Sequence, residues 1–194
     1  MLRFFVAFVF CMMASGTVFA ASTGLDVLSR FVVLGGLSQH SSVSFGYIDV
    51  SGLPVSNGRI RMAPNGNINN NIAEFSLAGG HTAGHVALYQ DIGNIEIRCT
   101  RTLHIANGIG DTVFINRVRI SLVSASGWGA ASDCNNLTGA PAATYDLTAD
   151  PASILDIFIG ARLRVNNGNP LNSMGVYNSS NPGGEFIELE VTVL

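Results

Sequence analysis

The sequence predicts an all-β protein: an antiparallel β-sandwich, Ig-like or pilin-like, built as a single domain. Apolar and polar residues alternate with period two in four segments, which is typical of strands with one buried face. Turn-forming residues separate the segments, and no stretch of helical length carries apolar residues at helical spacing. The four alternating segments are residues 95–99, 117–122, 157–165 and 187–193.

Shorter apolar runs predict further strands along the chain. Asn-Gly and Gly-Gly pairs between them supply the positive φ angles that tight hairpins need. Two polar stretches, residues 65–71 and 124–150, predict long surface loops, and residues 151–156 predict a single helical turn capped by Asp150. The shorter strands are expected, in chain order, at residues 26–34, 43–50, 59–62, 72–77, 85–89 and 102–106.

Composition narrows the function classes before any motif is considered. The chain has 194 residues and a mass of 20.4 kDa, enough for one domain with a substantial core. Charged residues make up 12% of it and the formal net charge is −3. This balance excludes a disordered tail, a coiled coil and a basic nucleic-acid binder. All ten basic residues are arginine, which excludes chemistry that needs a lysine amine.

Residues 1–20 are predicted to be a signal peptide that is removed from a mature domain of residues 21–194. Arg3 precedes an apolar run too short to span a bilayer, and small residues lead to a cut after Ala20. No other stretch is long and apolar enough to cross a membrane, so we expect no transmembrane segment in the mature chain. We therefore expect a secreted protein of the periplasm, the cell surface or the extracellular space.

Export changes the expectation for the cysteines. Cys11 leaves with the signal peptide, and the mature domain keeps Cys99 and Cys134. An even number of cysteines in an oxidising compartment favours a disulfide, and two cysteines allow one pairing. Two separate buried thiols are the alternative.

The sequence offers little that could carry catalysis, and we expect no enzyme, no cofactor and no metal site. His81 and His85 stand four residues apart, but three nearby glycines argue against the helix on which this spacing holds a metal. The sequence contains no nucleophile elbow, glycine-rich phosphate loop or calcium loop. An enzyme that uses His81 or His85 is the remaining catalytic alternative.

Several short stretches together carry a family resemblance. They are the Phe-Gly strand at residues 44–48, the turns at 58–60 and 64–66, the central hairpins, and the Pro-Gly-Gly turn at 182–186 before the last strand. In this layout the chain resembles an uncharacterised family of secreted bacterial β-sandwich domains, similar to spore-coat-type and archaic chaperone–usher pilin subunits. The resemblance implies export and a role at a surface or in an assembly, and it brings no catalytic residues.

The start of the mature domain indicates how such an assembly could form. Leu25, Val27, Phe31 and Val33 alternate along the segment that follows a small and flexible stretch at residues 21–24. A free strand of this pattern can complete the sheet of a neighbouring copy, and a first strand folded into its own domain would show the same pattern. We expect an exported structural protein whose partners are other copies or other surface subunits, and no nucleic acid.

A monomeric secreted binding module is the alternative function. Trp128 and Tyr145 lie in the long 124–150 stretch, and the 65–71 stretch is rich in asparagine. Such loops would recognise a glycan or a protein partner. A subunit gives ladders or filaments in solution, whereas a module gives a single monomeric species.

Overall fold

The computed structural model describes residues 21–27, 29–32, 37–51, 58–88, 94–146, 154–165 and 175–193. The predicted signal peptide and Val33 lie outside these residues. The described part is all-β and confirms the predicted fold class. Within it, no helix has the length and apolar character needed to cross a membrane.

The described strands are short to medium in length and follow one another closely along the chain. Their bounds, in chain order, are β1 (Ala21–Val27), β2 (Ser29–Val32), β3 (Leu37–Ser41), β4 (Val43–Val50), β5 (Gly58–Met62), β6 (Ile68–Asn70), β7 (Phe75–Leu77), β8 (Gly84–Leu88), β9 (Asn94–Cys99), β10 (Leu103–Ala106), β11 (Thr112–Ser121), β12 (Ser132–Asp133), β13 (Ala143–Asp146), β14 (Leu155–Val165), β15 (Tyr177–Asn178) and β16 (Ile187–Val193).

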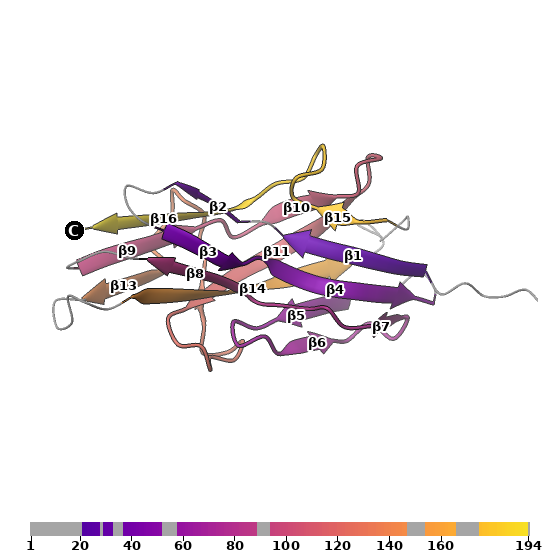
Figure 1. Cartoon of the computed structure of the whole chain (residues 1–194), viewed down its shortest axis with the longest axis horizontal. Helices are drawn as coiled ribbons and strands as arrows, with labels where there is room; N and C mark the ends of the chain where they lie inside the picture. Colours follow the sequence, from indigo (N-terminus) through magenta and orange to yellow (C-terminus); the bar gives the residue numbers. More distant parts are fainter. Residues whose placement is uncertain are drawn as a thin grey trace, which may run out of the picture.

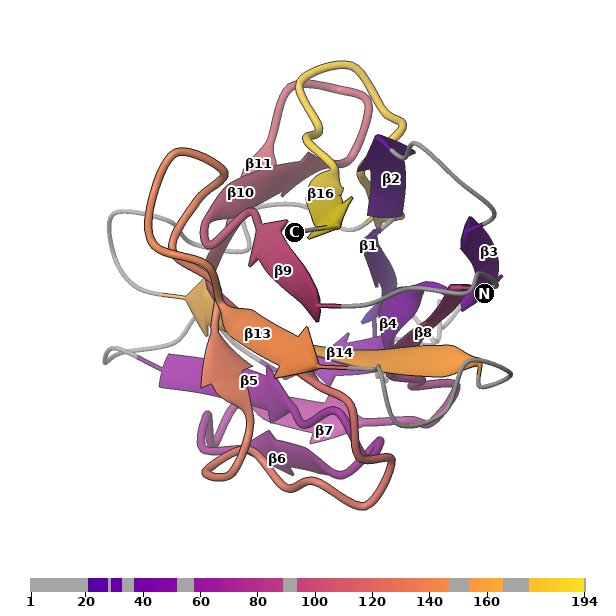
Figure 2. The same cartoon turned by 90° about the vertical axis from the view of Figure 1, so that its left-hand side faces the viewer.

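The strands form two sheets that pack face to face (Figure 1). The larger sheet runs in the order β3-β8-β14-β11-β10-β15-β1-β4-β7, with β5 and β6 continuing from β14 and β12 pairing with β11. The smaller sheet runs β13-β9-β16-β2. Figure 2 shows the larger sheet curling around β9 and β16 of the smaller one. A backbone bridge between Ser44 and Thr82 brings β4 beside the segment that enters β8, so the sandwich approaches a half-barrel.

The core lies between the two sheets and is built from alternate residues of the long strands. Ile95, Ile97 and Cys99 of β9 are fully buried, and the residues between them are half-buried. Ile187 and Leu189 of β16 are likewise buried. Because burial of apolar surface is the main driving force for folding, this pattern confirms the strand registers that the alternation predicts.

The Phe-Gly pair of the sequence forms a bulge in β4 opposite β1. Leu25 of β1 stands opposite Gly46 and Asp26 stands opposite Ser44, which leaves Phe45 as the extra residue. Gly46 has a φ of +70°, and a Cβ at this position would lie 2.0 Å from the carbonyl oxygen of Gly79. Only glycine fits this backbone conformation and this close approach.

Three stretches differ from the predictions. Residues 124–150 contain β12 and β13, and residues 65–71 contain β6, where the sequence predicts loops. Leu155 and Asp156 begin β14, where the sequence predicts a helical turn; residues 151–153 lie outside the described part. β6, β12 and β13 are too short or too polar for a period-two pattern to mark them, and pairing with longer neighbours sustains them instead.

Candidate functional site

The residues predicted to form a strand that is donated to a neighbouring copy lie on two strands in two different sheets. Leu25 and Val27 lie on β1, and Phe31 lies on β2. β1 pairs antiparallel with β4 from Ala21↔Val50 to Val27↔Val43, and Leu25 also stands opposite Tyr177 of β15 in a parallel pairing. β2, which contains Phe31, pairs in parallel with β16, and Leu189 stands opposite Phe31. The single strand predicted over residues 26–34 is therefore divided between the sheets.

β1 completes the larger sheet above several fully buried side chains. It lies between β15 and β4, whose Tyr177, Phe45 and Ile48 have no exposed surface. Removing β1 would leave the backbone donors and acceptors of these two neighbours unpaired beside apolar side chains. β2 takes the edge position of the smaller sheet next to β16. The N-terminal segment thus fills an internal place in one sheet and an edge place in the other.

The predicted disulfide between Cys99 and Cys134 is present, and it joins the two sheets. The two Cα atoms lie 5.1 Å apart, and both side chains are fully buried. Cys99 ends β9 of the smaller sheet, while Cys134 follows β12 and donates its backbone N–H to Val118 of β11, in the larger sheet. The bond therefore attaches the segment around β12 to the opposite side of the core.

Trp128, the first of the predicted loop residues, is held by an arginine of the neighbouring strand. The guanidinium carbon of Arg119 lies 5.1 Å from the centre of the indole ring, and the Arg119 side chain donates a hydrogen bond to the Trp128 carbonyl oxygen. Arg119 also donates from Nε to Asp133 at 2.6 Å. A half-buried ring in a cation–π contact is constrained in place.

Asp133 is the acidic centre of this arrangement. Burial raises the pKa of its carboxyl group, but the hydrogen bond from Arg119 and the charges of Arg119, Arg117 and Arg101 outweigh burial and hold the pKa below 3.8. Nε of Arg117 lies 3.5 Å from the same carboxylate, close enough for an ion pair and without a hydrogen bond. The carboxylate is therefore ionised at neutral pH and neutralises part of the surrounding arginine charge.

Tyr145, the second predicted loop residue, lies on a strand and not in a loop. It belongs to β13, where its backbone stands opposite Ile95 of β9. Trp128 borders strands of the larger sheet, whereas Tyr145 belongs to the smaller one. β13 is four residues long, and its sequence Ala-Thr-Tyr-Asp shows no clear alternation of apolar and polar residues. Only its pairing with β9 therefore identifies it as a strand.

The histidines lie apart from these residues. His81 is exposed in the segment before β8, and His85 is half-buried on β8 with Nε2 2.7 Å from Oδ1 of Asp156. The His85 ring stacks between the rings of His40 and Phe158, with centroids 4.8 and 4.7 Å away. In the described part of the chain, no group of three or more metal-ligating side chains gathers around them.

One group of polar residues is missing from the sequence predictions. The tripeptide Arg-aliphatic-Arg occurs three times, at residues 59–61, 117–119 and 162–164. Each occurrence lies in a strand, so each pair of arginines shares one face of its strand. The repeated tripeptide was the one sequence signal for this group of arginines. Nothing in the sequence indicates that the three strands are neighbours.

Comparison with protein-family models, curated proteins and solved structures finds no match to this chain. The family resemblance drawn from the short motifs therefore stays a prediction.

Proposed function

We propose that the mature chain is an exported structural protein of a bacterial surface, a pilus or coat-type subunit that assembles by β-strand addition. The observation that carries this proposal is the course of the N-terminal segment. It lies at one end of the predicted mature chain, yet its strands complete both sheets of the sandwich. A terminal segment of this kind can take the same places in a neighbouring copy.

Exchange of such a segment keeps the interactions that it makes within one copy. The backbone hydrogen bonds of β1 with β4 and of β2 with β16 would form again between copies, over the same apolar core. The difference in free energy between the closed and exchanged forms is then small, and protein concentration decides the outcome. β2 supports exchange further because it pairs over four residues at a sheet edge, in the parallel arrangement that is slightly weaker per residue.

The disulfide agrees with export and with a rigid subunit. A buried bond between Cys99 and Cys134 suits a protein that folds in an oxidising compartment. It joins the two sheets independently of β1 and β2, so the remaining strands stay connected while the N-terminal segment exchanges. A subunit that bears load needs this kind of internal connection.

A cross-linking experiment separates exchange between copies from pairing within one copy. Val32 and Glu190 stand opposite each other on β2 and β16, so the double variant Val32→Cys, Glu190→Cys can form a second disulfide there. For the mature protein oxidised at high concentration, we expect ladders of covalent oligomers on a non-reducing denaturing gel. The single variants serve as controls and give at most a dimer band.

The opposite outcome would support the alternative function. A double variant that is oxidised only within single chains, in a protein that remains monomeric at high concentration, contradicts assembly by strand addition. An added peptide of residues 25–34 should cap assemblies and shorten the ladders, whereas the same peptide with Phe31→Asp should not. Indifference to both peptides would favour the monomeric binding module, with Trp128 and Tyr145 as its first residues to test.

A further inference from the structure

The three Arg-aliphatic-Arg tripeptides form a continuous patch on the outward face of the larger sheet. β14 lies between β5 and β11, and Arg162 stands opposite Arg61 on one side and Arg117 on the other. The middle residue of each tripeptide is fully buried, which turns the arginines away from the core. We call this patch the arginine face. It consists of Arg59, Arg61, Arg117, Arg119, Arg162 and Arg164.

Positive charge on the arginine face is only partly neutralised. In the described part of the chain, Asp133 pairs with Arg117 and Arg119, and no carboxylate lies within ion-pair distance of the other four arginines. The stretches that adjoin β5 and β14 in the sequence, residues 52–57 and 166–174, contain no aspartate or glutamate. Burial and the charges of the neighbouring arginines lower the pKa of Arg162. Among the described residues, Asp133 is thus the one counter-charge in ion-pair distance of this face, and Arg59, Arg61, Arg162 and Arg164 are held together without one.

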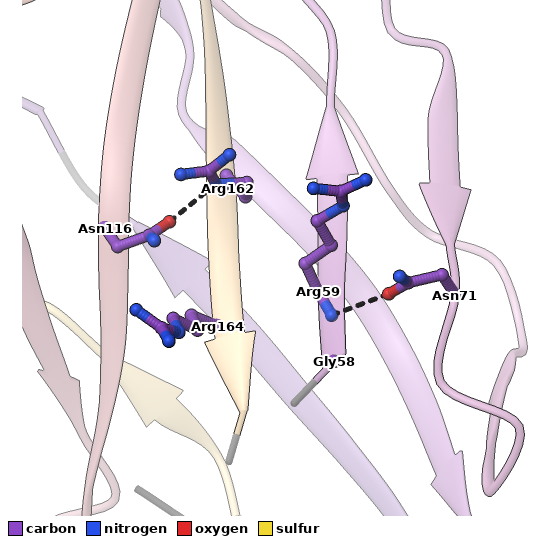
Figure 3. A pocket seen from close by; sticks show the side chains of 6 residues that line it. All are labelled: Gly58, Arg59, Asn71, Asn116, Arg162 and Arg164. Carbon is purple, nitrogen blue, oxygen red and sulfur yellow. Dashed lines mark hydrogen bonds between the residues drawn. The ribbon is translucent and has the colours of Figure 1, made fainter. Parts of the chain in front are cut away.

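A polar cleft of about 340 Å³ opens on this face, lined by Gly58, Arg59, Asn71, Asn116, Arg162 and Arg164 (Figure 3). Asn116 is the extra residue of a bulge in β11, and its Oδ1 accepts a hydrogen bond from Nε of Arg162 at 2.7 Å. Oδ1 of Asn71 accepts from the backbone N–H of Arg59 at 2.8 Å. Figure 3 shows the guanidinium groups of Arg162 and Arg164 turned to the same side, towards Asn116.

The hydrogen-bonding groups left over in the cleft are donors. Within the described residues, the guanidinium groups of Arg59 and Arg164 make no hydrogen bond, and neither do the amide NH2 groups of Asn71 and Asn116. Elsewhere on the arginine face, Nε of Arg61 is buried without a hydrogen-bond partner. A buried donor without a partner is unusual in a folded protein, whereas Arg59, Arg164 and Asn71 are exposed and their donors stay open to water or to a ligand. A ligand for this site must supply several acceptors and negative charge.

We propose that the cleft binds an acidic sugar unit, a saccharide that carries a carboxylate or a sulfate group. The planar guanidinium groups match the two-oxygen geometry of these anions, and the amide NH2 groups suit ring and hydroxyl oxygens. With each water occupying about 30 Å³, the cleft holds on the order of ten waters, far more than one inorganic anion displaces. Among the described residues, the lining carries no aromatic or large aliphatic side chain, which favours a hydrophilic ligand.

The same observations argue against nucleic acid as the ligand. Single-stranded nucleic acids bind by stacking their bases on aromatic rings, and none of the described residues that line the cleft has a ring. Long polyanions also need a broad positive surface, whereas the formal net charge of this chain is −3. The inference does not depend on strand exchange, so a failure of either proposal leaves the other standing.

Calorimetric titration of the mature protein at low ionic strength tests the cleft directly. The probes are an oligogalacturonate, its fully methyl-esterified and uncharged form, a sulfated oligosaccharide, and inorganic sulfate. We expect at least one of the two charged saccharides to bind, and the methyl ester and inorganic sulfate to bind at least tenfold more weakly. Affinity should fall as salt is added, because charge supplies much of the interaction.

Matched variants assign the binding to the cleft. Arg162→Gln with Arg164→Gln should lower the affinity at least tenfold, while Arg98→Gln on the smaller sheet removes a charge elsewhere and should leave it unchanged. Arg164→Gln alone changes an exposed residue and serves if the double variant fails to fold. The proposal is overturned by no binding of either charged saccharide, by equal binding of the ester or of inorganic sulfate, or by equal losses in the cleft and Arg98 variants.

Discussion

The smaller sheet alternates the signs of its charges on its outward face. Arg98 of β9 stands opposite Glu190 of β16, and its guanidinium lies 3.4 Å from the carboxylate of Glu96. On the larger sheet, Arg162 stands between Arg61 and Arg117, and Arg164 stands opposite Arg59. Opposite charges across neighbouring strands stabilise a sheet, and like charges destabilise it. At these positions the smaller sheet therefore carries a stabilising arrangement of charges, whereas the larger sheet carries a destabilising one.

The connection between the two sheets gives the largest expected effect. Replacing Cys99 and Cys134 together with alanine removes the disulfide and should lower the free energy of unfolding by about 3–4 kcal/mol on the chain-entropy estimate. Urea unfolding of the mature protein measures the change, and a thiol reagent should find no free thiol in the denatured, unreduced wild type. A variant with the wild-type midpoint would mean that the sheets hold together without the bond.

An intermediate effect on stability is expected at Asp133, whose carboxylate pairs with two arginines of the arginine face. Asp133→Asn leaves Arg117 and Arg119 without their anion and should lower the free energy of unfolding at neutral pH by about 1.5–3 kcal/mol. Glu96→Gln is the matched change on the smaller sheet, where a peripheral ion pair contributes about 0–1 kcal/mol. Equal losses in the two variants would remove the distinction between the two faces.

The pH dependence of the stability difference between wild type and Asp133→Asn tests independently whether the charge of Asp133 causes the effect. Because the pKa of Asp133 is lowered from 3.8 in the folded protein, its stabilising contribution is present above about pH 4 and is lost as the pH falls through the lowered value. The difference in unfolding free energy between wild type and Asp133→Asn should therefore shrink between neutral pH and about pH 2. A constant difference would assign the effect to packing and not to charge.

The smallest effects are expected for one arginine substitution on each sheet, and the two changes in the free energy of unfolding should have opposite signs. Arg164→Gln removes a charge that faces Arg59 and should raise the free energy of unfolding by about 0.2–0.5 kcal/mol. Arg98→Gln removes an ion pair and a hydrogen bond to the Gly139 carbonyl, and should lower it by about 1 kcal/mol. Both changes in the free energy of unfolding should diminish in high salt. If the two variants lost equal stability, the difference drawn between the charges of the two sheets would be contradicted.

Much of the fold follows from the sequence because its signals are local. The period-two alternation of residues 95–99 and 187–193 marks strands with one buried face. The structure buries Ile95, Ile97, Cys99, Ile187 and Leu189, while Val191 is partly buried. The pairing of Cys99 with Cys134 follows from counting the cysteines of the predicted mature domain. The Phe-Gly pair marks a place where only glycine fits, although its role as a bulge in β4 is visible only once β1 lies beside it.

Only the tertiary structure decides which strands are neighbours. A residue's position within a period-two pattern sets the face it occupies, but it carries no information about the strand alongside. Arg59 and Arg164 are separated by 105 residues in the sequence (164 − 59) and stand opposite each other because β5 pairs with β14. The division of the N-terminal segment between two sheets and the strand at Tyr145 depend in the same way on distant hydrogen-bond partners. The polar cleft on the arginine face exists because non-local strand pairing brings the three Arg-aliphatic-Arg tripeptides together.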